Sequence, residues 1–319
     1  MKILFVGYRY TYHSKYGGYD WISKYPESDY FDIRKIPFLG PRFMQKRGGR
    51  FVPVLAAFMS IVFSRKYDVI HFFYADRCLA NPLFISRKTK VIATTHLRSG
   101  DYSKKYITRL QRCSTVIALS SEEVQNLQTF GVRAVFLPHG FSFPQFTAGT
   151  QKSLSDEKVH IFFSGSNYRD EQTFFYIATQ MRLARPDIMF HAVGQSPDWK
   201  ERMRSMENVK VYSFLPDDEY YSLLSRCDYN FLPLIFATAN NALLEAQSLG
   251  IISILPKIGG IADYASETHN LFYESLDMLY QLFLRLGKGA RDDGLIDFAR
   301  QFEWENIYGK LRVLYKEAR

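Results

Sequence analysis

Ionisable and amide side chains follow apolar runs at several points of the chain, where a strand would hand over to a loop or helix. Glu245 and Asn241 are four residues apart in a helical run, so both can face one ligand from adjacent turns. Arg169 lies in a small polar turn that begins at Gly165, and its rigid guanidinium can hold a phosphate. These residues predict a site for a phosphate-bearing ligand, although an arginine in such a turn is also commonly a solvated residue.

A second candidate group lies in the first half of the chain. His96 follows the apolar run VIATT, and the pair Gly17-Gly18 follows the first apolar run. A lone histidine is more often structural than catalytic, but the position of His96 at the carboxyl end of a predicted strand favours function, so both interpretations stand. The glycine pair allows either close backbone approach to a ligand or simply a tight turn.

The elements that must position these residues alternate between strands and helices. Short β-branched runs separated by helical runs indicate parallel sheets, whose carboxyl edges bind ligands next to helix amino termini. Residues 135–146, broken by Pro138, Gly140 and Pro144, are a linker candidate. The predicted strands are residues 2–6, 68–73, 90–94, 115–119, 159–164, 188–193, 209–214, 229–234, 251–255 and 271–273; the predicted helices are residues 121–130, 171–185, 198–206, 217–226, 241–249 and 276–286.

Length and charge limit the class of protein to which this chain can belong. A chain of 319 residues, 47% of them hydrophobic, predicts two folded domains. Residues 1–150 hold 22 Lys and Arg against 9 Asp and Glu, whereas residues 151–319 hold 19 against 23. The basic first half predicts an anionic partner, either a membrane surface or a phosphate-bearing molecule. No nucleic-acid motif accompanies the charge, so we expect no nucleic-acid partner.

A membrane contact is expected from Arg34 to Lys66, where basic residues flank the apolar residues 51–63. The alternative is a buried helix preceded by a solvated basic loop. The apolar run of 13 residues is too short to span a bilayer, and the N-terminus indicates a first strand rather than a signal peptide. Three cysteines without CxxC spacing favour reduced thiols. We therefore expect a cytoplasmic protein, peripheral on the inner face of the membrane.

Four segments in order carry a family resemblance: residues 116–146, residues 208–234, NNALLEAQSLG at 240–250 with IGGIADY at 258–264, and residues 301–317. The chain resembles the retaining GT-B glycosyltransferases of family four (glycosyl transferases group 1). The resemblance implies an α/β fold of two Rossmann-like domains whose parallel sheets face each other across a cleft. It implies an N-terminal acceptor-side domain at 1–144, a nucleotide-sugar donor domain at 145–300, and a C-terminal helix at 301–319 that crosses back onto the first domain.

The resemblance also implies roles for single residues. Glu245 would hold the ribose hydroxyls of the nucleotide, and Ala237 stands where the family has a first acid. His96 and Arg169 would be the catalytic residues, beside the donor sugar and the diphosphate. The other donor-binding residues would be Gly17, Gly18, Gly165, Asn240, Asn241, Ala242 and Leu243, and Phe214 and Leu215 would lie near the nucleotide base.

The implied reaction moves a sugar from a nucleotide-diphosphate donor to a hydroxyl of a glycan or lipid-linked acceptor, with retention, in cell-surface glycan or glycolipid assembly. We expect no cofactor and no metal, because the chain shows no acidic cluster of the DxD type in a suitable place. The alternative is a GT-B protein that binds a nucleotide or glycan without turnover, which the alanine at position 237 keeps open. A GT-B epimerase would use more acids than this chain offers.

Overall fold

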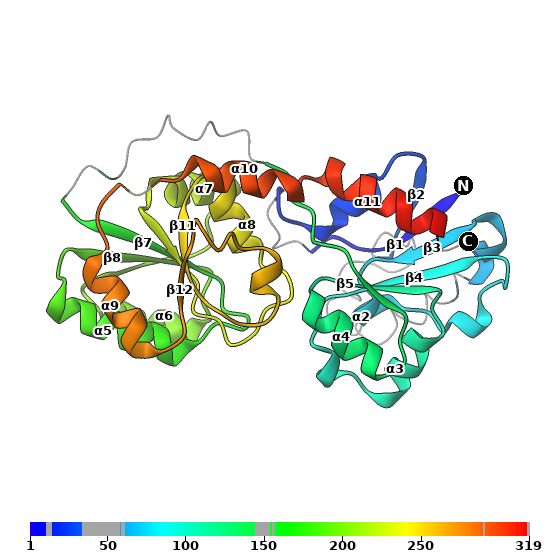
Figure 1. Cartoon of the computed structure of the whole chain (residues 1–319), viewed down its shortest axis with the longest axis horizontal. Coiled ribbons are helices and arrows are strands. Elements are labelled where there is room, and N and C mark those ends of the chain that lie inside the picture. The colour runs from blue at the N-terminus through cyan, green and yellow to red at the C-terminus, as the bar shows by residue number, and fades with distance from the viewer. Residues whose placement is uncertain are drawn as a thin grey trace. The chain divides into compact units, whose positions relative to one another are not determined.

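The computed structural model describes residues 1–10, 15–33, 58, 61–143, 154, 157–289 and 291–317. The chain divides into two compact units, Met1–Ser142 with Phe302–Arg319, and Phe143–Gln301. Each unit is an α/β layer structure built on one parallel sheet (Figure 1). Most of the stretch from Arg34 to Lys66, where a membrane contact is expected, lies outside the described residues.

The first unit contains a six-stranded parallel sheet in the order β2-β1-β3-β4-β5-β6. Helices α3 and α4 cover one face, and the C-terminal helix α11 lies on the other (Figure 1). The strands are β1 Ile3–Gly7, β2 Ser28–Asp32, β3 Val69–Phe72, β4 Lys90–Thr95, β5 Thr115–Ala118 and β6 Ala134–Phe136; the helices are α2 Ala75–Cys78, α3 Lys104–Gln111, α4 Ser121–Thr129 and α11 Trp304–Glu317.

The second unit repeats the plan with the strand order β12-β11-β10-β7-β8-β9. Helices α5, α6 and α9 cover one face, while α7, α8 and α10 cover the other (Figure 1). The strands are β7 Val159–Ser164, β8 Ile188–Val193, β9 Val209–Tyr212, β10 Tyr229–Phe231, β11 Ile252–Pro256 and β12 Leu271–Tyr273; the helices are α5 Glu171–Ala184, α6 Pro197–Arg204, α7 Asp217–Arg226, α8 Asn241–Ser248, α9 Leu276–Arg285 and α10 Asp293–Ala299.

The last helix of the chain is attached to the first unit by buried polar contacts. The hydroxyl of Tyr315 lies 2.6 Å from Nδ1 of His71 on β3, and Nε2 of the same imidazole lies 2.7 Å from the hydroxyl of Thr94. Tyr308 on α11 donates to the carbonyl of Trp21 at 2.6 Å. Burial lowers the pKa of His71 to about 3, so its ring is neutral inside the sheet.

Two strands differ from the sequence-based expectation. β2 was not predicted, because its residues SDYFD are half-buried or exposed and lack the apolar run of an inner strand. β6 overlaps the start of the predicted linker at 135–146, where three residues before Pro138 pair with β5. Both are edge strands, which tolerate polar and irregular sequence because only one side is paired.

No described helix combines the length and the apolar character that crossing a membrane requires. All three cysteines, Cys78, Cys113 and Cys227, are free and buried.

Candidate active site

Glu245 is held by two tyrosines on the neighbouring helix. It lies on α8 with 6% of its surface exposed. Tyr220 on α7 donates to Oε2 at 2.8 Å, and Tyr221 donates to Oε1 at 3.0 Å. The two phenols therefore fix the position of the carboxyl group.

Arg169 belongs to the loop between β7 and α5, which is tied to the loop that follows β10. Asp170 donates its N–H to the carbonyl of Pro233 at 2.8 Å, and Ile235 donates to the carbonyl of Tyr168 at 3.0 Å. Gly165 opens the loop with a φ of +75°, a conformation that disfavours any side chain. Nε of Arg169 donates to the carbonyl of Ser164 at 2.9 Å. The guanidinium is thus folded back over the carboxyl end of β7.

Arg169, Tyr220 and Glu245 interact electrostatically with one another. Burial lowers the pKa of Arg169 to about 10, while Tyr220 and Glu245 act to raise that pKa. The pKa of Tyr220 lies well above its usual range, first because of burial and then because of the Glu245 charge. At neutral pH the cluster therefore holds a guanidinium cation and a protonated phenol beside the side chain of Glu245.

The amino terminus of α8 begins beside this cluster. Asn240 is the N-cap, and its side-chain oxygen accepts the N–H of Leu243 at 3.2 Å. The cap thereby engages the N–H of Leu243, one of the groups expected to meet a diphosphate. Asn241 and Ala242, two of the predicted donor-binding residues, form the first turn of the same helix.

Ala237, at the position of the family's first acid, is buried with 3% of its surface exposed. Its carbonyl accepts the N–H of Gly260 at 2.9 Å, which connects the loop before α8 to the Gly-Gly turn after β11. The residue therefore has a structural role through its backbone, and its methyl group brings no charge to the site.

The predicted base-contact residues differ in exposure. Phe214 and Leu215 lie in the loop between β9 and α7, and Phe214 is 78% exposed whereas Leu215 is half-buried. Because α7 begins at Asp217, this loop leads directly into the helix that carries Tyr220 and Tyr221. An exposed ring at this place offers a face for a nucleotide base.

In the first unit, His96 follows β4 and is held by the buried carboxylate of Asp76. Oδ2 of Asp76 accepts the backbone N–H of His96 at 2.9 Å and lies 3.4 Å from Nδ1 of its ring. The hydroxyl of Tyr102 donates to the other carboxylate oxygen. Burial acts to raise the pKa of Asp76, but the contacts with His96 and Tyr102 outweigh it and hold that pKa below its usual value. Asp76 thus orients His96 as a charged carboxylate.

Two tyrosine rings enclose the imidazole of His96. The ring of Tyr74 lies 4.6 Å from it, and the ring of Tyr19 meets it edge-on at 4.8 Å between centroids. Gly17 and Gly18 are buried directly before Tyr19, and Gly18 is the extended N-cap of the short helix Tyr19–Lys24. The glycine pair and His96 are therefore neighbours at the carboxyl edge of the first sheet.

The structure groups the predicted residues into two sets, one in each unit. Gly165, Arg169, Asn240 and Glu245 belong to the second unit, whereas Gly17, Gly18 and His96 belong to the first. Sequence reasoning missed Tyr220, Tyr221 and Asp76. The adjacent tyrosines on a helix gave no sign that both would reach one carboxylate, and Asp76 lies on a helix of only four residues.

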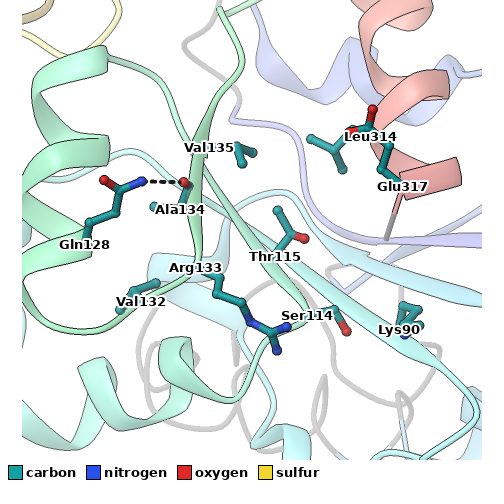
Figure 2. A pocket seen from close by; sticks show the side chains of 10 residues that line it. All are labelled: Lys90, Ser114, Thr115, Gln128, Val132, Arg133, Ala134, Val135, Leu314 and Glu317. Atoms are coloured by element: carbon teal, nitrogen blue, oxygen red, sulfur yellow. Dashed lines mark hydrogen bonds between the residues drawn. The ribbon is translucent and has the colours of Figure 1, made fainter. Parts of the chain in front are cut away.

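A hollow of about 640 Å³ lies away from both sets (Figure 2). It is found at the amino-terminal ends of β4 and β5, on the sheet edge opposite His96, where Gln128 donates to the carbonyl of Ala134 at 3.2 Å. Its lining residues are Lys90, Ser114, Thr115, Gln128, Val132, Arg133, Ala134, Val135, Leu314 and Glu317. Within the described part of the chain, no group of three or more His, Cys, Asp or Glu is placed to hold a metal ion.

Comparison with known families agrees with this two-unit arrangement. Residues 11–142 match the family described as Glycosyltransferase Family 4, and residues 158–286 match Glycosyl transferases group 1. The chain belongs to the family 4 glycosyltransferases. No curated protein sequence matches the chain. The enzyme class is thus that of a glycosyltransferase, and the expected family is confirmed.

Solved structures of similar fold cover nearly the whole glycosyltransferase chain. A sucrose-phosphate synthase from Thermosynechococcus elongatus has a TM-score of 0.74 at 14% identity and covers 99% of this chain and 98% of its own. The lipopolysaccharide outer core galactosyltransferase WaaB has a TM-score of 0.71 at 13% identity, with 98% of both chains covered. HepE of Anabaena in complex with UDP-glucose has a TM-score of 0.68 at 15% identity, covering 99% of this chain and 100% of its own. These likenesses confirm the GT-B fold.

Proposed function

We propose that this glycosyltransferase uses a nucleotide-diphosphate sugar, with uridine diphosphate as the first candidate nucleotide. The proposal rests mainly on the cluster of Arg169, Tyr220 and Glu245 beside the start of α8. HepE, which has a similar fold, is described in complex with UDP-glucose. A buried carboxylate suits two ribose hydroxyls, and a cation next to a helix amino terminus suits a diphosphate.

In the proposed reaction the bond between the anomeric carbon and the diphosphate oxygen breaks, and an acceptor hydroxyl bonds to that carbon. Negative charge grows on the leaving diphosphate, where a preformed cation stabilises it most effectively. Arg169 would supply this charge, because it is charged at neutral pH and its side chain is fixed by the β7 carbonyl. No metal is needed in this proposal, and the family resemblance supports retention at the anomeric carbon.

His96 is proposed to contact the donor sugar, with Asp76 holding the ring in one orientation. The acceptor is proposed to be a glycan or lipid-linked hydroxyl of cell-surface glycan or glycolipid assembly, for which the similarity to WaaB is the support. Free cysteines agree with a cytoplasmic setting, and the basic first half agrees with a peripheral position on the inner face of the membrane.

The second candidate function is nucleotide binding without turnover, which the buried Ala237 at the position of an acid favours. Release of UDP, measured with a panel of UDP-sugars and glycolipid acceptors, separates the two. Acceptor-dependent release that is lost in Arg169→Ala supports transfer. Tight UDP binding with no release from any donor would reject it in favour of a binding protein.

A further inference from the structure

The tripeptide Ser-Arg-Lys occurs twice in the first unit, at 64–66 and at 86–88, each time after an apolar residue. The structure brings the two copies together: Ser86 donates its N–H to the hydroxyl oxygen of Ser64 at 3.3 Å. Thr89 adds a second link between the two segments, because its hydroxyl donates to the carbonyls of Ser64 and Tyr67. Two segments far apart in the chain, 62–66 and 83–88, therefore form one surface, which we call the paired-SRK surface.

Large apolar side chains of this surface are exposed. Leu83 and Phe84 are 63% and 64% exposed, and Val62 is 54% exposed. Val62 and Phe84 line a hollow of about 510 Å³ together with Arg65 and Arg87, and Leu83 precedes Phe84 in the chain. Exposed apolar side chains gathered around one hollow are unusual for a surface that meets only water.

Cations accompany these apolar groups. Arg65, Lys66, Arg87 and Lys88 are all exposed, and neither segment contains an acidic residue. The nearest acid in the sequence, Asp68, accepts the backbone N–H of Lys2 at 2.8 Å. Asp29 lies close by, where it accepts the hydroxyl of Tyr67 at 2.8 Å, but no ion pair with these four cations is seen among the described residues. Apolar side chains amid such cations are complementary to a lipid interface, where acyl chains meet the apolar groups and anionic headgroups meet the cations.

We propose that the paired-SRK surface is where the protein contacts an anionic lipid bilayer. Leu83 and Phe84 enter the headgroup region, and the two Arg-Lys pairs meet lipid phosphates. This assigns a defined surface to the membrane partner proposed above, and half of it lies outside the stretch from Arg34 to Lys66. The contact requires neither donor nor acceptor, so it can fail while the transfer reaction stands.

The test is sedimentation of the full chain with vesicles of phosphatidylcholine alone and of phosphatidylcholine mixed with phosphatidylglycerol. We expect binding to the mixed vesicles only, weakened by added salt because headgroup attraction is screened. The double variant Arg65→Glu/Arg87→Glu should bind at least about 30-fold more weakly, because two cations are lost and two carboxylates that anionic lipid repels are added. The double variant Leu83→Ser/Phe84→Ser should bind the mixed vesicles at least about 10-fold more weakly, because its apolar contact with the lipid is lost.

Matched controls come from the second unit. Arg182→Glu/Arg204→Glu changes net charge equally at exposed positions, and Leu183→Ser removes a side chain that is 73% exposed. Both should bind like the unaltered protein. The proposal would be overturned if the control variants lost as much vesicle binding as the surface variants. It would also be overturned if the protein bound both vesicle types equally, or bound neither. UDP-induced stabilisation, measured on the same variants, shows whether the donor site is intact and keeps the two proposals separate.

Discussion

Each unit holds a carboxylate against tyrosine hydroxyls at the carboxyl edge of its sheet, but the two carboxylates face different tasks. Glu245 accepts from Tyr220 and Tyr221 and has Arg169 nearby. Asp76 accepts from Tyr102 and from the backbone of His96. We propose that the first meets the nucleotide directly, whereas the second positions the side chain of His96.

The surroundings of the two carboxylates explain this difference. The Glu245 cluster contains a cation and a helix amino terminus, which together favour an anionic ligand. The Asp76 cluster contains the aromatic rings of Tyr74 and Tyr19 around one imidazole. Rings and a fixed imidazole suit a neutral sugar. We therefore expect variants in the second unit to affect nucleotide binding or leaving-group departure, and variants in the first to affect turnover alone.

The largest effect is expected from Arg169→Ala. Loss of a cation that stabilises charge appearing in the transition state should lower kcat about 100-fold to 1000-fold. Arg182→Ala, on the exposed side of α5, is the matched control and should leave kcat unchanged. Steady-state UDP release measures both. A small change in kcat for Arg169→Ala would show that the diphosphate is stabilised by other groups.

Glu245→Gln should weaken UDP binding about 10-fold to 100-fold, because charge-assisted hydrogen bonds to the ribose are lost. Glu267→Gln, at a carboxylate that is 65% exposed, serves as the control. Isothermal titration with UDP measures the dissociation constants. Unchanged affinity in the Glu245 variant would mean that the two tyrosines hold this carboxylate for structural reasons only.

Asp76→Asn should lower kcat about 10-fold with little change in KM, because the amide no longer fixes the His96 ring as a carboxylate does. The comparison predicts unaltered UDP affinity, which distinguishes this variant from Glu245→Gln. Kinetics at varied donor concentration provide the kcat and KM values. If Asp76→Asn weakened UDP binding as much as Glu245→Gln does, the two carboxylates would not have the different roles proposed here.

The smallest effect concerns stability. Burial lowers the pKa of His71 to about 3 from its usual value of 6.5, so below about pH 6.5 the unfolded chain binds a proton that the folded chain does not. The free energy of unfolding should fall as pH decreases, by up to about 1.4 kcal/mol per pH unit. His71→Gln should reduce this dependence in urea unfolding at about pH 7 and about pH 5. An unchanged slope would contradict a neutral buried His71.

The sequence predicted the inner strands because their β-branched and aromatic runs are buried on both faces, as in β7 and β8. It missed β2 and β6 because an edge strand needs no such run. The position of Glu245 on a helix that follows a strand was enough to predict that it lies near the carboxyl edge of the sheet. The contacts of Tyr220 and Tyr221 with Glu245 could not be predicted. They depend on how α7 and α8 pack together, and this packing leaves no periodic pattern in the sequence of either helix.

Leu243 illustrates the same limit within a single helix. Its place at the start of α8 predicted a free N–H, yet that group donates to the Asn240 side chain. Asparagine is both a good N-cap and a good ligand contact, and the sequence pattern is the same for either role. Only the hydrogen bonds of the folded chain decide between them.

The most direct test of the donor site is thermal unfolding of the intact chain with a panel of nucleotide diphosphates and nucleotide sugars. A nucleotide at about 100 times its dissociation constant should add about 2.7 kcal/mol to the free energy of unfolding. We predict such stabilisation by UDP and its reduction to about 0.4–1.4 kcal/mol in Glu245→Gln at the same concentration, as a 10-fold to 100-fold weaker affinity requires. Stabilisation by no member of the panel would contradict the assignment of Arg169, Tyr220 and Glu245 as a nucleotide site.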